Sequence, residues 1–233
     1  MVANHKVVSH DEWLAARKEH LAKEKEFTWL RDQLSQQRCD LPWERVEKEY
    51  IFEAGERKES LSQLFAGRSQ LIVYHFMFHP SWNEGCPSCS FWADNFNGII
   101  VHLNHRDVTM VAVSKAPIEK LEDYKKRMGW TFKWVSSLDT DFNCDYQVSF
   151  TPEEMQKGEM VYNYTASKFP VEEAPGISVF YLDNNGGIFH SRGLDMLNGA
   201  YHYLDLVPKG RDEDALSYPM AWLRRYDSYD KSL

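Results

Sequence analysis

The residues best suited to chemistry are two cysteines separated by two residues, Cys86 and Cys89. A thiolate attacks a disulfide, and a second thiol within reach resolves the mixed disulfide that forms. The same spacing also suits zinc, for which His79 together with His75 or Cys144 would complete the ligand set. No second C-x-x-C or H-x-x-x-H pair lies at a finger-like distance. The spacing therefore favours dithiol redox chemistry, with a zinc site and a pair of inert thiols as alternatives.

The residues around the two cysteines predict unequal roles for them. Pro87 suits the first position of a helix, where its missing N–H costs nothing, and this makes Cys86 the N-cap. Unpaired N–H groups and the helix dipole then stabilise a Cys86 thiolate. Cys89 lies one turn further along and should be more buried, with a higher pKa, because the helix continues into an apolar stripe of Trp92, Phe96, Ile100 and Leu103. Cys86 is thus the expected nucleophile and Cys89 the resolving thiol.

The motif follows an apolar run at 71–78, which is typical of a strand buried on both faces. The expected elements around it, in chain order, are an edge strand at 47–53, a polar turn at 56–60, a helix at 60–67, the strand at 71–78, the motif helix, a strand at 108–114, a helix at 117–128 and a strand at 131–136. Alternating strands and helices imply parallel strands joined by right-handed crossovers. We expect one α/β domain.

The rest of the chain divides into an N-terminal helical extension at 1–45, the domain at 46–207 and a docked tail at 208–233. The domain contains a long insertion at 139–174, a hairpin at 176–190 and a last helix at 193–206. Ser9 and Glu12 form a capping box at the start of the extension. A docked extension is favoured over a coiled-coil homodimer because heptads are not sustained, although a homodimer remains a possible assembly.

Composition excludes several classes of function. The formal net charge is −8 and no basic cluster interrupts it, which argues against nucleic-acid binding. No signal peptide and no membrane-spanning apolar run is found, so we expect a cytoplasmic protein away from membranes. Structural disulfides are uncommon in that compartment, so the four cysteines are expected to be catalytic, metal-binding or inert. We expect no cofactor.

Longer strings of sequence resemble a known family. The segments YHFMF (74–78), GCPSCSFWAD (85–94), VSKAP (113–117), RMGW (127–130), WVSS (134–137) and FN-x-D (142–145) are similar to a thioredoxin-like domain family of unknown function. Its members are labelled as predicted dithiol–disulfide oxidoreductases. The resemblance runs from about Trp13 to Tyr229, and the entry at 49–78 resembles the peroxiredoxin-like branch of the superfamily. It implies a thioredoxin-like fold, with a mixed central sheet flanked by helices.

Further residues are candidates for roles at the site, and the resemblance implies the first of them. Pro175 stands where this fold has a cis-proline, which would present the backbone of Ala174 to a bound peptide. Trp82 is a candidate substrate-docking residue. His79 and Pro87 are candidate modulators, although a structural role for His79 is favoured. Glu84 would oppose thiolate formation if it lay close to Cys86.

The expected function is thiol–disulfide exchange on a protein or small-molecule substrate, with a reductant that the sequence does not identify. Thiol peroxidases carry a Pro, a Thr or Ser, and a Cys at fixed spacing, and the segment from Pro80 to Cys86 lacks the hydroxyl at the required place. The alternative is a non-catalytic binding module that uses the 139–174 insertion as its contact surface.

Overall fold

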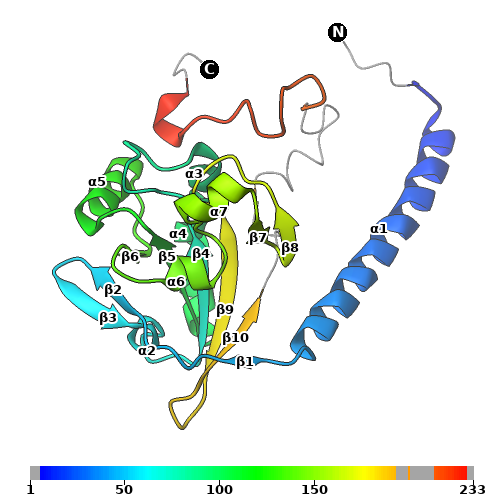
Figure 1. Cartoon of the computed structure of the whole chain (residues 1–233). Coiled ribbons are helices and arrows are strands. Elements are labelled where there is room, and N and C mark those ends of the chain that lie inside the picture. The colour runs from blue at the N-terminus through cyan, green and yellow to red at the C-terminus, as the bar shows by residue number, and fades with distance from the viewer. Residues whose placement is uncertain (1–5, 193–198, 200–212, 230–233) are drawn as a thin grey trace.

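The computed structural model describes residues 6–192, Gly199 and residues 213–229 (Figure 1). The helix expected at 193–206 lies outside the described residues apart from Gly199, which is helical. An eight-stranded sheet forms the centre, in the order β1-β10-β9-β4-β5-β6-β2-β3. Its strands are β1 (Glu44–Arg45), β2 (Ile51–Ala54), β3 (Arg57–Ser60), β4 (Gln70–His75), β5 (Val108–Ser114), β6 (Lys133–Ser136), β9 (Gly176–Leu182) and β10 (Ile188–Arg192).

Four neighbouring strands define the fold. β4 and β5 are parallel and belong to a strand–helix–strand unit, whereas β9 pairs antiparallel with β4 and β10 pairs antiparallel with β9. A βαβ unit followed by an antiparallel hairpin in this order, with a C-x-x-C motif after the first strand, is a thioredoxin-like fold. β6 extends the parallel part beside β5, as the expected order of elements predicts.

The edge of the sheet differs from the prediction. β2 pairs antiparallel with β6 and forms a hairpin with β3, so the parallel strands begin only at β4. The segment 56–60 was expected to be a turn, but Gly55 at a φ of 65° makes the tight turn and residues 57–60 continue as β3. Glycine adopts this left-handed backbone without a steric penalty, which is why the chain reverses there.

The helices are α1 (His10–Cys39), α2 (Leu61–Leu64), α3 (Pro87–Ala93), α4 (Phe96–His105), α5 (Ile118–Met128), α6 (Phe142–Asp145) and α7 (Pro152–Lys157), with a 3-10 turn at Tyr226–Ser228. The single helix expected after the motif is in fact two, because the chain breaks at Asp94 and Asn95 between α3 and α4. Among the described helices, none is both long enough and apolar enough to cross a membrane.

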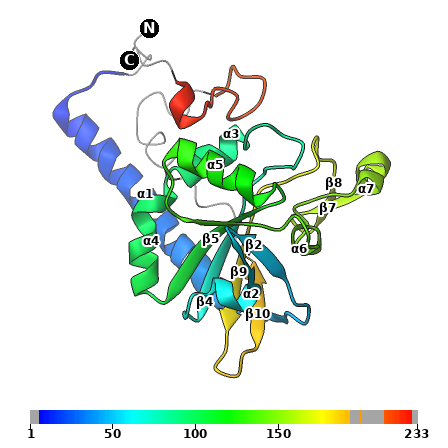
Figure 2. The ribbon, with the colours of Figure 1, turned by 90° about the vertical axis from the view of Figure 1, so that its left-hand side faces the viewer.

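The core lies on both faces of the sheet and is built largely from rings. On one face, α3, α4 and α5 cover a cluster that includes Tyr74, Phe76, Trp130 and Trp134. On the other face, α2 and α6 cover a cluster that includes Phe52, Leu64, Phe142 and Phe180. The insertion carries α6, α7 and the small hairpin β7 (Met160–Tyr162) and β8 (Thr165–Ser167), and it lies on the side of the sheet away from α4 (Figure 2).

α1 is a 30-residue helix that begins with the expected capping box, since Ser9 and Glu12 bond each other's backbone N–H groups. The docked extension favoured from the sequence is wrong. No residue of α1 is buried against the described part of the chain, and the helix stands away from the sheet along most of its length (Figure 1). Its C-terminal end alone reaches the body, where β1 follows it and pairs with β10.

Candidate functional site

The C-x-x-C motif is held at the end of β4 by backbone contacts. The N–H of Cys86 donates to the carbonyl of Met77 at 3.1 Å, and Cys86 is the N-cap of α3 with Pro87 at its first turn, as predicted. Gly85 lies against Phe76, and a Cβ at this position would stand 2.7 Å from the ring. Only glycine therefore permits this close approach of the loop to the strand.

Cys86 is half-buried, and its surroundings favour the thiolate. A hydrogen bond from the Cys89 thiol outweighs burial, and together with the backbone N–H groups of Cys89 and Ser88 and the charge of Arg225 it lowers the pKa of Cys86 to about 7. About half of these thiols are then ionised at neutral pH, and the thiolate is the form that attacks a disulfide. The helix start supplies the two N–H groups, as expected for an N-cap position.

Cys89 has the opposite environment. It is 2% exposed, and burial together with the neighbouring Cys86 raises its pKa well above the ordinary value. The hydroxyl of Tyr74 is also buried, has no hydrogen-bond partner among the described residues, and lies close enough to Cys89 for each group to shift the pKa of the other. A buried hydroxyl without a hydrogen-bond partner costs free energy in the folded state. Because the Tyr74 hydroxyl lies beside Cys89, we assign it to the candidate site as well as to the core.

Arg225 comes from the C-terminal segment and was not anticipated from the sequence. Its guanidinium donates to the carbonyl of Gly85 at 2.8 Å and to the hydroxyl of Tyr124 at 2.9 Å. Tyr124 in turn bonds Ser90, whose hydroxyl donates to the carbonyl of Cys86. A positive charge 139 residues further along the chain is thereby fixed beside Cys86.

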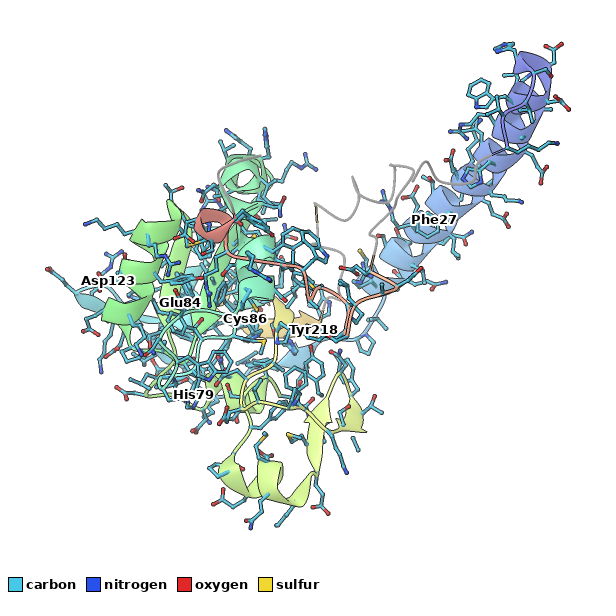
Figure 3. All side chains as sticks on the ribbon, turned by 90° about the horizontal axis from the view of Figure 1, so that it is seen from above. Phe27, His79, Glu84, Cys86, Asp123 and Tyr218 are labelled. Carbon is cyan, nitrogen blue, oxygen red and sulfur yellow. The ribbon has the colours of Figure 1, made fainter. Side chains whose placement is uncertain are left out.

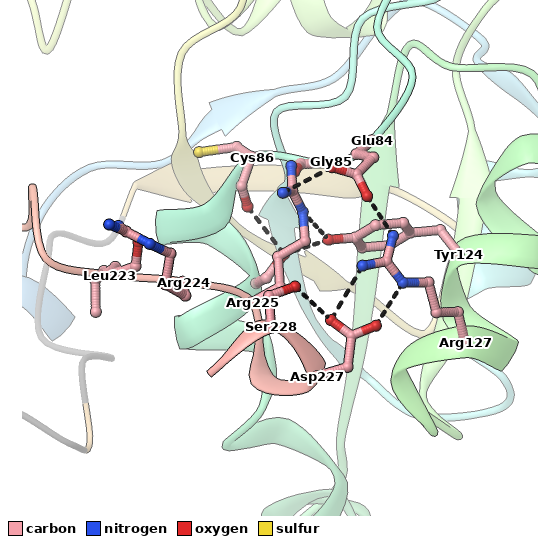
Figure 4. Close-up of polar contacts among 11 residues, drawn as sticks. Glu84, Gly85, Cys86, Tyr124, Arg127, Leu223, Arg224, Arg225, Asp227 and Ser228 are labelled. Atoms are coloured by element: carbon pink, nitrogen blue, oxygen red, sulfur yellow. Dashed lines mark hydrogen bonds and ion pairs between the residues drawn. The ribbon is translucent and has the colours of Figure 1, made fainter. Parts of the chain in front are cut away.

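Glu84 lies beside the motif, but its charge is balanced. Arg127 bonds one of its carboxylate oxygens, and Arg225 bonds the other at 2.7 Å. Asp227 pairs with Arg127 on the far side, so the loop, α5 and the C-terminal segment share one ionic network (Figure 4). Glu84 was expected to oppose thiolate formation if it lay close to Cys86, and here two arginines offset its charge.

The C-terminal segment is anchored by apolar contacts as well as by charge. The ring of Trp222 packs edge-on against Phe91 of α3 with centroids 5.9 Å apart, and Leu223 is 4% exposed. Cys86 lies between this segment, which carries Tyr218, and the loop that carries His79 and Glu84 (Figure 3). In this view, two separate parts of the chain therefore lie on either side of Cys86.

Ala174 and Pro175 precede β9, whose Gly176 is paired with His75 at the end of β4. The cis bond expected before Pro175 is absent, since every peptide bond among the described residues is trans. The N–H of Ala174 donates to the carbonyl of Val148 at 2.8 Å, and the carbonyl of Pro175 accepts from Tyr162 at 2.7 Å. Residues of the insertion therefore already hydrogen-bond the Ala174 N–H and the Pro175 carbonyl, in the segment that the resemblance predicts would bind a peptide.

His79 and Trp82 lie in the loop before the motif. The Nδ1 atom of His79 is hydrogen-bonded to Ser81 at 2.8 Å, and the His79 ring lies 6.2 Å from that of Trp82. Trp82 is partly buried against the core, and its carbonyl accepts from Lys120 at 2.9 Å. The described contacts of His79 give it a role in shaping the loop, whereas Arg225 supplies the charge next to Cys86.

The zinc alternative finds no geometric support. His75 bonds Ser178 at 2.9 Å and stacks on Phe142, which belongs to the other face of the sheet, and Cys144 is exposed on α6. Among the described residues, no group of three or more His, Cys, Asp or Glu side chains is arranged to hold a metal ion.

A cavity of about 480 Å³ lies away from the motif. It is bounded by the end of α1, the insertion and the start of β9, and its lining includes Leu34, Tyr146, Tyr162 and Ile177. Neither Cys86 nor Cys89 lines it.

The fold and the placement of the dithiol define a thioredoxin-like protein. The chain belongs to a family described as bacterial protein of unknown function (DUF899), whose sequence profile matches residues 2–229. No match was found among curated proteins.

Several solved structures are similar to the chain. Peroxidoxin BcpB from Mycobacterium tuberculosis has 11% identity and a TM-score of 0.46, over 69% of this chain and 91% of its own. A mutant PrxQ from Xylella fastidiosa has 15% identity and a TM-score of 0.41, over 68% and 90%. A putative thiol-disulfide oxidoreductase from Bacteroides vulgatus has 13% identity and a TM-score of 0.39, over 63% and 82%. The strand order and the position of the motif, rather than these similarities, define the fold.

Proposed function

We propose that the chain is a thiol–disulfide oxidoreductase that uses Cys86 as nucleophile and Cys89 as resolving thiol. The observation that carries the proposal is the asymmetry of the pair. The pKa of Cys86 is lowered to about 7, whereas Cys89 is buried, has a raised pKa and donates a hydrogen bond to Cys86. A half-buried low-pKa thiolate beside a fully buried thiol suits attack followed by resolution.

The reaction proceeds in two exchanges. The Cys86 thiolate attacks one sulfur of a substrate disulfide, so that a mixed disulfide forms and the other substrate sulfur leaves as a thiolate that takes up a proton. Cys89 then loses its proton and attacks the Cys86 sulfur, which releases the second substrate thiolate and leaves a Cys86–Cys89 disulfide. Two electrons pass to the substrate, and a separate dithiol or thiol reductant must return them.

The second exchange is the difficult one, because burial disfavours a Cys89 thiolate. Tyr74 offers a remedy, since its unpartnered hydroxyl can donate to the sulfur once the negative charge develops there. A donor that is fixed in a dry site before the charge forms stabilises it without reorganisation. Tyr74 thus acts on resolution rather than on the first attack.

The test follows the two exchanges separately with oxidised glutathione as substrate. Cys86→Ser should abolish turnover and form no glutathione adduct, whereas Cys89→Ser should accept one glutathione on Cys86 and hold it, as mass spectrometry would show. The proposal fails if both single variants turn over at the rate of the unchanged protein. Turnover with hydrogen peroxide but not with any disulfide would identify a peroxidase instead.

A binding module is the second candidate, because the cavity beside the insertion is remote from the dithiol and is lined by tyrosines. The redox potential of the Cys86–Cys89 couple distinguishes the two. A couple outside any physiological range, with no turnover, favours the module. The zinc content of the purified protein tests the metal-binding alternative. The two exposed free thiols, Cys39 and Cys144, fit a reducing compartment such as the cytoplasm.

A further inference from the structure

α1 presents an apolar seam to solvent. Trp13, Phe27, Leu30 and Leu34 are each more than half exposed, although α1 is a continuous helix about 45 Å long. Phe27 lies on the part of the helix that stands away from the body (Figure 3). Large apolar side chains exposed along one helix are typical of an interaction surface.

The seam has the spacing of a helix pair. Alternating steps of three and four residues, which place side chains along one face, connect Trp13, Ala16, His20, Lys23, Phe27, Leu30, Leu34 and Gln37. Polar residues interrupt the seam in its middle, and for that reason the sequence does not present sustained heptads. The helix is unbroken through these positions and buries none of them in the described structure. Leu34 and Gln37 face the cavity that the end of α1 forms with the insertion and β9, so the seam is open to a partner from Trp13 to Leu30.

The charges beside the seam are sorted by sign. One flank carries Glu12, Glu19 and Glu26, followed by Gln33. The other flank carries Arg17, Arg31 and Arg38, with Glu24 as the exception. In a parallel pair, a residue of the first flank lies next to the residue numbered five higher on the second flank of the partner helix. In an antiparallel pair, the first flank of one helix lies next to the first flank of the other, and the second flank next to the second.

We propose that α1 pairs in parallel with α1 of a second copy of this chain. Glu12 would meet the partner's Arg17, and Glu26 would meet the partner's Arg31, each contact occurring twice by symmetry. Glu19 would meet the partner's Glu24, which is the one unfavourable contact of the parallel arrangement. An antiparallel pair would instead set acidic flanks against each other, which is unfavourable. In the described structure Glu26 and Arg31 take part in no ion pair, whereas Arg17 is bound by Glu24 at 2.8 Å. The Glu26 and Arg31 charges are thus the ones free to select a partner.

The strength of the pair follows from its size. Trp13 and Phe27 expose on the order of 100 Å² each, and the seam as a whole stays below the roughly 800 Å² per partner of a standard interface. His20 and Lys23 weaken the middle further. We therefore expect a reversible dimer that dissociates in the micromolar range, independent of the redox state of Cys86 and Cys89.

The first experiment exchanges charges in the full-length protein and measures the dimer dissociation constant by sedimentation velocity. Glu26→Arg should raise it about tenfold, because two attractive pairs become repulsive. Adding Arg31→Glu to that variant should restore the original value. Asp32→Arg is the matched control, because it makes the same change of charge on the outer face of the helix. It should leave the dimer dissociation constant close to that of the unchanged protein.

The second experiment determines orientation by cross-linking, in a chain whose four native cysteines are replaced by serine. Ala16→Cys places a thiol in the seam, so a parallel pair brings the two copies of that position together and mild oxidation should yield a covalent dimer. Ala15→Cys lies outside the seam and serves as the matched control. Equal cross-linking at both positions, no restoration by the double exchange, or a monomer at every concentration would each overturn the proposal.

Discussion

Cys89 is expected to lower the pKa of Cys86 as well as to resolve the mixed disulfide that Cys86 forms. Two substitutions separate these roles. Cys89→Ala removes the thiol and its hydrogen bond, whereas Cys89→Ser removes the thiol but keeps a donor of similar reach. Neither variant can resolve a mixed disulfide. Any difference between them therefore reports the hydrogen bond to Cys86 alone.

The structure bounds the size of the effect. The pKa of Cys86 falls from an ordinary value of 9.0 to about 7, and the largest single cause is the hydrogen bond from Cys89. Two pKa units correspond to about 2.7 kcal/mol in favour of the thiolate. Burial still opposes ionisation once the donor is gone, so we expect Cys89→Ala to raise the pKa to about 8 or above. Cys89→Ser should stay within about half a unit of the unchanged protein.

The assay is the pH dependence of alkylation by iodoacetamide, with Cys39→Ser and Cys144→Ser in the background so that Cys86 is the only remaining thiol. Near pH 6.5 the alanine variant should react several-fold more slowly than the serine variant, because less of its thiol is ionised. At high pH, where both thiols are ionised, the difference should disappear. Identical titration midpoints for the two variants would refute the hydrogen bond as the cause of the low pKa.

Two further predictions concern Tyr74 and Arg225 beside the dithiol, and a third concerns Glu173, a buried carboxyl of the insertion. Tyr74→Phe should leave alkylation of Cys86 unchanged but prolong the glutathione mixed disulfide about tenfold or more, measured by quench and mass spectrometry; an unchanged lifetime would contradict its role. Arg225→Met should slow alkylation near pH 7 about two- to threefold, while Arg225→Lys should retain most of the rate because the charge remains. Burial raises the pKa of Glu173 from 4.5 to about 7, so it holds a proton in the folded state that it loses when unfolded, and stability should fall as pH rises from about 4.5 to 7. Glu173→Gln should remove this decrease in the free energy of unfolding, which chemical denaturation should measure as up to about 3 kcal/mol. If the free energies of both proteins changed with pH in the same way, Glu173 would not be the cause.

Local spacing predicted the parts of the fold and of the site that depend on neighbouring residues. The capping box at Ser9, the helix start at Pro87 and the strand at 108–114 all follow from a few adjacent side chains, and each is found. The break between α3 and α4 was missed because the apolar stripe keeps its helical spacing through the break. α1 was placed wrongly because a narrow apolar stripe predicts burial without identifying the surface that would provide it.

The electrostatic parts of the site depend on contacts that no local pattern reveals. Arg225 reaches Gly85 across 140 residues, and the polar tail from which it comes has no periodicity that would direct it there. Tyr74 carried a weak signal, since a hydroxyl inside an otherwise apolar buried strand needs a partner. The hydrogen bonds of Ala174 and Pro175 could not be predicted either, because their partners lie in the insertion, whose sequence has no regular hydrophobic pattern.

These contacts suggest where the specificity of the dithiol is determined. A proline at the helix start and two backbone N–H groups stabilise the thiolate in any C-x-x-C motif that opens a helix, so they cannot distinguish one such protein from another. Arg225 and Tyr74 act on different cysteines and come from different parts of the chain. Arg225 lowers the pKa of Cys86, the attacking thiol of the proposed mechanism, and Tyr74 lowers that of Cys89, the proposed resolving thiol. Because the two exchanges have separate determinants, substitution at one residue should alter the rate of attack or the lifetime of the mixed disulfide without altering the other.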